Sequence, residues 1–115
     1  MKLIELENII DIEIEKSLVR FGNMESFYIK FLKKFIDDKS LQSLTEGIER
    51  GDLKKVGESA HTLKGVAGNL GLKKIYELSM ELMKVESLTK DEINSLYEEL
   101  KIEMEKTVEA LSKLD

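Results

Sequence analysis

The stretch that decides the fold is DLKKVGESAHTLKGVAGNLG, residues 52–71. Its apolar side chains follow one another at alternating steps of three and four residues: Leu53, Val56, Ala60, Leu63, Ala67 and Leu70. In an α-helix this spacing keeps the side chains within about a quarter of the circumference. The stretch therefore predicts a helix that buries one face in a bundle, with Asp52 as its N-cap and Gly71 at its end.

Similar apolar stripes lie on both sides of this helix. Residues 24–36 predict an aromatic helix with Asn23 as its N-cap, and a further stripe predicts a helix that ends at Gly51. Residues 37–40 are expected to break the chain between these two helices. After Gly71 come another helix up to Val85 and a long final helix, which begins at the capping-box pattern of residues 89–92. The apolar positions of the last two helices are Ile75, Leu78, Leu82 and Val85, then Ile93, Leu96, Leu100, Met104, Leu111 and Leu114.

The chain has 115 residues and no proline, and these patterns place it in the all-α class. We expect one domain over residues 1–115, built as an antiparallel four-helix bundle over residues 23–114. In residues 1–20, isoleucines alternate with acidic residues, but a lone strand would have no partner. We expect a short helix or an extended segment that covers one end of the bundle.

Composition narrows the function classes. The chain contains no cysteine, which excludes disulfides, thiol nucleophiles and cysteine-based metal sites. A net charge of -5 argues against a general nucleic-acid binder. Acidic residues interrupt the first residues where a signal peptide needs an apolar run, and no segment predicts a membrane span. We expect a cytoplasmic monomer that binds neither nucleic acid nor a membrane.

The only histidine, His61, lies in the one basic part of the chain. Residues 50–74 hold six basic and two acidic side chains, a balance that favours a phosphoryl group or an acidic partner. A single imidazole without cysteine cannot belong to a catalytic triad or a metal cluster. Any reaction at His61 must therefore use this imidazole alone, without a second catalytic or metal-binding side chain of that kind.

On the helix of residues 52–70, His61 projects roughly 130° from the apolar face and should meet solvent. Four residues fall on the same side within about 60°, and Lys54 lies two turns earlier; the four are Gly57, Lys64, Gly65 and Gly68. Each glycine costs a helix roughly 1 kcal/mol relative to alanine, so local stability does not explain them. Free access to the imidazole would explain them, while close helix packing stays open as the reason for Gly68 and Gly71.

The run from His61 to Gly71, HTLKGVAGNLG, resembles the signature of histidine-containing phosphotransfer (HPt) domains. The similarity extends upstream through the aromatic helix and downstream to about Val85. The resemblance implies a four-helix bundle that has no kinase or phosphatase activity and acts as an intermediate in a two-component phosphorelay. His61 would accept a phosphoryl group from a receiver-domain aspartyl phosphate and pass it to another receiver aspartate.

The same resemblance assigns roles to the neighbours of His61. Lys64 would stabilise the phosphoryl group, Gly65 would leave room for it, and we expect Lys54, Gly57 and Gly68 to form the surrounding partner-binding surface. The chain would need no cofactor, because the Mg²⁺ would belong to the receiver domain. The expected partners are response-regulator receiver domains and a hybrid sensor histidine kinase.

Other interpretations stay open. A docking module with this fold would bind a receiver or kinase without passing phosphate. A helical bundle that neither transfers phosphate nor docks a partner is the remaining alternative. An enzyme with a glycine-rich phosphate loop at residues 65–71 is disfavoured, because the run lacks the Gly-Lys-Ser/Thr ending of a P-loop. One departure from relatives concerns ring orientation: Met83 occupies the position where they often carry a polar contact, so Ser79 or water would have to orient the imidazole.

Overall fold

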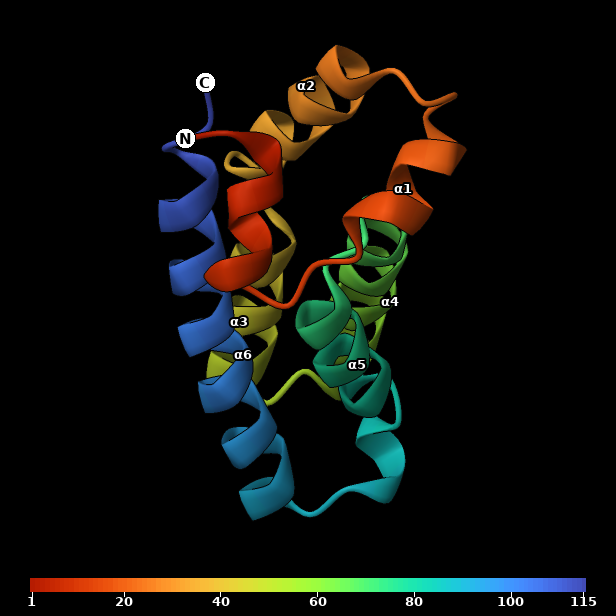
Figure 1. Ribbon diagram of the computed structural model, residues 1–115. Helices are drawn as coiled ribbons and strands as arrows, with labels where there is room; N and C mark the ends of the chain where they lie inside the picture. The colour runs from red at the N-terminus through yellow and green to blue at the C-terminus, as the bar shows by residue number, and fades with distance from the viewer.

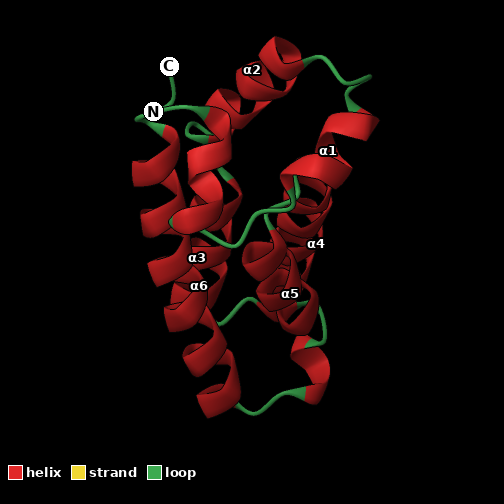
Figure 2. Cartoon of the chain, in the orientation of Figure 1, coloured by secondary structure: helices red, strands yellow, loops and turns green.

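The structure is a computed structural model that describes all residues, 1–115. Helices follow one another along the whole chain without a strand (Figures 1 and 2). In order they are the 3-10 helix η1 (Leu3–Asn8), α1 (Ile14–Arg20), α2 (Glu25–Phe35), α3 (Ser40–Arg50), α4 (Leu53–Leu70), α5 (Lys73–Leu82), the 3-10 helix η2 (Val85–Ser87) and α6 (Lys90–Leu111). The all-α prediction is confirmed. No helix is both long and apolar enough to cross a membrane.

The four helices from α3 to α6 lie side by side with similar axis directions, and α1 and α2 cross one end of them (Figure 1). α3 packs on α4, α4 on α5, and α5 on α6. The two termini meet at the end where α2 crosses (Figure 1), and the Met1 ammonium lies 2.8 Å from a carboxylate oxygen of Asp115. The molecule is elongated, with extents of 40 × 23 × 20 Å.

The apolar face of α4 lies at the centre of a single core. Five of the six predicted positions are buried: Val56, Ala60, Leu63, Ala67 and Leu70. The prediction was wrong for Leu53, whose side chain is 44% exposed. Leu53 is the first residue of the helix and lines a surface hollow with Lys54 and Met83 instead of reaching the core.

Several predicted helix ends are correct, but the helix expected to run up to Val85 ends at Leu82, and Val85 begins the separate 3-10 helix η2. Gly51 and Gly71 take the left-handed conformation, with φ of 66° and 76°, that ends α3 and α4. Asp52 accepts a hydrogen bond of 3.1 Å from the backbone N–H of Lys55, and residues 89–92 form a capping box. The predicted N-cap Asn23 was wrong. Its φ is 59°, because it helps to turn the chain between α1 and α2, and α2 covers only Glu25–Phe35.

The N-terminal residues fix the C-terminal end of α4. Ile12 forms an isolated antiparallel bridge with Leu72, so one of the alternating isoleucines has a partner after all. The Arg20 guanidinium donates to the carbonyls of Gly68 and Asn69 at 3.1 and 3.2 Å. The Tyr28 hydroxyl donates to the Leu70 carbonyl at 2.6 Å. The bonds to Asn69 and Leu70 satisfy carbonyls that the end of a helix leaves free, and all three bonds connect α1 and α2 to the C-terminal end of α4.

Candidate functional site

His61 lies near the middle of α4, on the face opposite the core, and is exposed as predicted. Both residues beside it on the inner face, Ala60 and Leu63, are completely buried. The imidazole has no hydrogen bond or ion pair with another side chain of the protein. Helix α4 thus presents to solvent an imidazole that has no hydrogen-bond or ion-pair partner within the protein.

The space beside the imidazole is open at Gly65. A Cβ atom added at Gly65 would meet no heavy atom within 4 Å. Gly65 also lines a hollow of about 440 Å³, whose far wall includes Phe31, Lys34 and Asp38. The structure therefore leaves open space at Gly65, which lies four positions after His61 on the same side of α4.

The other two glycines have different surroundings. A Cβ atom at Gly57 would lie 3.4 Å from the Val85 side chain, which is an ordinary contact. At Gly68 it would lie 3.0 and 3.1 Å from two ring atoms of Tyr76 on α5. Close packing of Tyr76 thus explains the absence of a side chain at Gly68, whereas neighbouring atoms do not explain it at Gly65.

Two ammonium groups on this face are uncommitted. Lys54 is exposed and Lys64 is half-buried, and neither forms an ion pair. Lys55, by contrast, points towards α3 and lies 2.8 Å from a carboxylate oxygen of Glu46. Lys64 follows His61 by three positions, so the two side chains lie on neighbouring turns of the same face. The Lys64 ammonium is therefore free to interact with a negative group attached to the imidazole.

An apolar surface adjoins the hollow at Gly65. Met24 and Phe27 of the α2 region are 54% and 41% exposed, and Val19 of α1 is 65% exposed. The Phe27 ring packs edge-on against Phe31, with the ring centroids 5.0 Å apart, and Phe31 lines the hollow. The Lys34 ammonium lies 5.1 Å from the centre of the Phe31 ring. The aromatic stripe of α2 thus has a buried side and an exposed side.

Sequence reasoning missed part of this surface. Lys34 and Asp38 at the hollow were not singled out, and neither was the exposed Val19. Lys34 stands three positions after Phe31, a spacing that could have identified it as a neighbour of the aromatic side chain.

Ser79 does not orient the imidazole. It is completely buried in α5, and its hydroxyl has no hydrogen-bond partner, so it cannot contact an exposed ring. Met83 is half-buried and lines the hollow at Gly57, about 460 Å³ in volume. No cluster of three or more His, Asp or Glu side chains with the spacing of a metal site occurs in the chain.

The chain matches known proteins in this region. The family model described as "Hpt domain" matches residues 31–113. Over 83 residues the chain is 35% identical to the sensory/regulatory protein RpfC in two strains of Xanthomonas campestris pv. campestris. The match covers 69% of this chain and 11% of each relative, so the chain spans only about a tenth of their length. No solved structure gives a significant match.

The matched residues include α3 to α6, and with them the helix that carries His61, Lys64 and Gly65. The family model covers well over half of the chain, and the all-helical structure agrees with it. The chain belongs to the Hpt domain family.

Proposed function

We propose that this chain accepts a phosphoryl group on His61 from the aspartyl phosphate of a receiver domain and passes it to another receiver aspartate. Hpt domains perform histidine phosphotransfer in two-component phosphorelays, and they are neither kinases nor phosphatases. The observation that carries the assignment to His61 is its position: an exposed, uncommitted imidazole beside the open space at Gly65.

The main contribution of this chain to the first transfer is a nucleophile held in place. The imidazole Nε2, the ring nitrogen farther from the backbone, attacks phosphorus with its lone pair. As the N–P bond forms, the bond from phosphorus to the aspartate oxygen breaks, and the aspartate leaves as a carboxylate. Such transfer depends mainly on positioning and charge stabilisation, which a fixed helix and an aligned partner can supply. A carboxylate of a second receiver reverses the same steps.

The neighbours of His61 have separate roles in the proposal. The Lys64 ammonium approaches the phosphoryl oxygens and stabilises their charge. Gly65 leaves the space that the phosphoryl group and the partner's side chains require. Lys54, Gly57 and Gly68 form the surrounding contact surface, while the exposed side chains of Phe27 and Met24 provide apolar contact to the receiver.

We also propose the architecture around this site and the place where the protein acts. The helices α3 to α6 form an antiparallel four-helix bundle, residues 1–20 cover one end of it, and residues 1–115 make one domain. The protein acts as a cytoplasmic monomer, without a cofactor of its own. The Mg²⁺ that assists the transfer is held by the acidic pocket of the receiver domain, and a hybrid sensor histidine kinase is one source of such a receiver.

Incubation with a phosphorylated receiver domain tests the proposal. We expect the wild-type chain to gain a label that is stable to alkali and lost in acid, and His61→Gln to gain none while its circular dichroism is unchanged. Lys64→Ala should slow the transfer, whereas Lys106→Ala on the exposed side of α6 removes the same charge without effect. Equal labelling of wild type and His61→Gln would refute the assignment. Receiver binding without any labelling would identify the docking module instead.

A further inference from the structure

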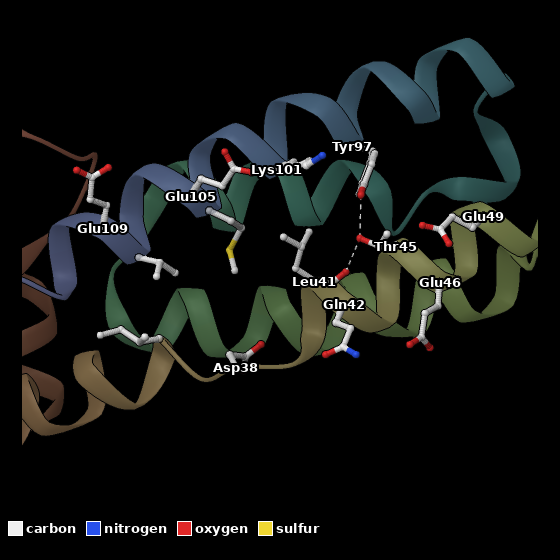
Figure 3. Close-up of a pocket in the computed structure, with 13 residues that line it drawn as sticks. Asp38, Leu41, Gln42, Thr45, Glu46, Glu49, Tyr97, Lys101, Glu105 and Glu109 are labelled. Carbon is white, nitrogen blue, oxygen red and sulfur yellow. Dashed lines mark hydrogen bonds between the residues drawn. The ribbon is translucent and has the colours of Figure 1, made fainter.

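A groove runs between α3 and α6 (Figure 3), and His61 is not among the residues that line it. α3 packs on α4 and α6 packs on α5, but α3 and α6 approach each other only loosely. The hydroxyl groups of Thr45 and Tyr97 lie 2.9 Å apart and bridge the two helices near one end. The groove has a volume of about 830 Å³, and no residue of α4 lines it.

The groove has an apolar floor. Its hydrophobic lining residues are Ile36, Leu41, Tyr97, Met104 and Val108. Met104 is buried, whereas Leu41 and Val108 are half-buried and therefore present part of their surface to solvent. Covering this floor with the apolar face of another molecule would remove hydrophobic surface from water, which favours association.

The rim of the groove is strongly acidic. Five carboxylates line it, against the single ammonium of Lys101; they are Asp38, Glu46, Glu49, Glu105 and Glu109. Glu46 and Glu109 have lysine partners that lie outside the groove. Glu49 and Glu105 stand on opposite helices and form no ion pair. The rim therefore complements a ligand that carries positive charge along its edges.

The length of the groove indicates the kind of ligand. Its lining residues on α6 run from Tyr97 to Glu109, which corresponds to roughly 18 Å along a helix. A helix of about three turns has the same length. The groove is an open trough, whereas a small-molecule site encloses most of its ligand. An amphipathic helix laid in a groove with its apolar side down is an established mode of protein recognition.

We propose that the groove between α3 and α6 docks a basic amphipathic helix of a partner protein. The apolar side of that helix covers Leu41, Met104 and Val108, and its lysine or arginine side chains face Glu49 and Glu105. Because no residue of α4 lines the groove, the docked helix leaves His61 free. A partner could then stay bound while the histidine exchanges its phosphoryl group with a receiver.

A synthetic peptide tests the docking. The probe is a 14-residue peptide of leucine and lysine that places its leucines on one helical face, and the matched probe has glutamate in place of every lysine. In titrations of the ¹⁵N-labelled chain, we expect the lysine peptide to shift the amide signals of Leu41, Tyr97 and Val108. The glutamate peptide should leave them in place. Shifts centred on the face of α4, or equal shifts with both peptides, would overturn the proposal.

Matched charge reversals locate the contact. The double variant Glu49→Lys/Glu105→Lys should weaken binding of the lysine peptide about tenfold or more, because each reversal replaces an attraction by a repulsion. Glu98→Lys/Glu99→Lys changes the net charge equally, on exposed α6 positions outside the groove, and should weaken it less than about threefold. Gln42→Trp, at an exposed lining position, should fill the trough and also weaken binding. Equal weakening by both double variants would refute the groove as the site.

The histidine variant separates this proposal from phosphotransfer. His61→Gln should bind the lysine peptide with the affinity of the wild-type chain, and a saturating peptide should leave phosphoryl transfer to His61 unchanged. Failure of labelling would thus leave the docking result intact. Sedimentation of the free chain as a dimer whose contacts are the groove residues would overturn the proposal, since a second copy would then occupy the groove.

Discussion

Gly65 provides a test in which stability and function move in opposite directions. A glycine in a helix is roughly 1 kcal/mol less stable than alanine and about 0.5 kcal/mol less stable than glutamine. Because the position is open, a new side chain meets no neighbour that offsets this gain. We expect Gly65→Ala to raise the free energy of unfolding by about 1 kcal/mol, which corresponds to about 4 °C in the melting temperature. Gly65→Gln should raise the free energy by about half as much.

The same glutamine should damage phosphotransfer. Its side chain would extend into the open space at Gly65, one helical turn from His61, where the proposal places the phosphoryl group and the receiver. Displacement of the reacting groups by about 1 Å can cost a hundredfold in rate. We therefore expect Gly65→Gln to slow transfer from a phosphorylated receiver by about a hundredfold. Gly65→Ala should have a smaller effect in the same direction.

Two measurements on the same protein samples check this pair of expectations. Urea denaturation gives the free energy of unfolding, and rapid-quench labelling gives the rate of transfer from the receiver. A Gly65→Gln variant that transfers at the wild-type rate would refute the role of the open space. Loss of stability in Gly65→Ala would show that the position is packed in solution, contrary to its surroundings in the structure.

Three further substitutions test the packing around α4 and the start of α6. Gly68→Ala should be at least about 1 kcal/mol less stable than Gly65→Ala in urea denaturation, because the new methyl group presses on the Tyr76 ring. Tyr28→Phe should cost about 1–2 kcal/mol, because it leaves a carbonyl of α4 without its 2.6 Å hydrogen bond. Burial raises the pKa of Tyr28, so the folded protein holds the phenol proton more tightly than the unfolded chain does. The resulting stabilisation is fully present below about pH 10, the ordinary pKa of tyrosine, and is lost as the pH rises through the raised pKa. Urea denaturation curves measured at increasing pH should show this loss. Thr89→Ala should cost about 1 kcal/mol of unfolding free energy, because it removes the capping box of α6.

The sequence predicted α4 and its boundaries well because the information is local. Apolar residues at steps of three and four define the buried face, and Asp52 and Gly71 act on the backbone next to them. The exposed position of His61 follows from the same helical geometry. The stripe of α2 was harder to interpret: it is wider than the surface that covers it, so Tyr28 is buried while Phe27 remains 41% exposed.

Contacts between distant parts of the chain could not be predicted. Gly65 and Gly68 are alike in sequence, and only the position of the Tyr76 ring on α5 distinguishes the open glycine from the packed one. The bridge between Ile12 and Leu72 likewise has no local signal, because Ile12 precedes α1 whereas Leu72 lies between α4 and α5, 60 positions later. Such contacts depend on how the helices are placed relative to one another. A short stretch of sequence carries no information about that placement.

The most direct measurement of the role of His61 is the chemical identity of the phosphorylated atom. We predict that ³¹P nuclear magnetic resonance of the ¹⁵N-labelled chain, after transfer from a phosphorylated receiver, shows a phosphoramidate coupled to Nε2 of the single histidine. The signal should vanish in acid and be absent from His61→Gln. A phosphoryl group found on any other residue, or the same signal in His61→Gln, would contradict the assignment.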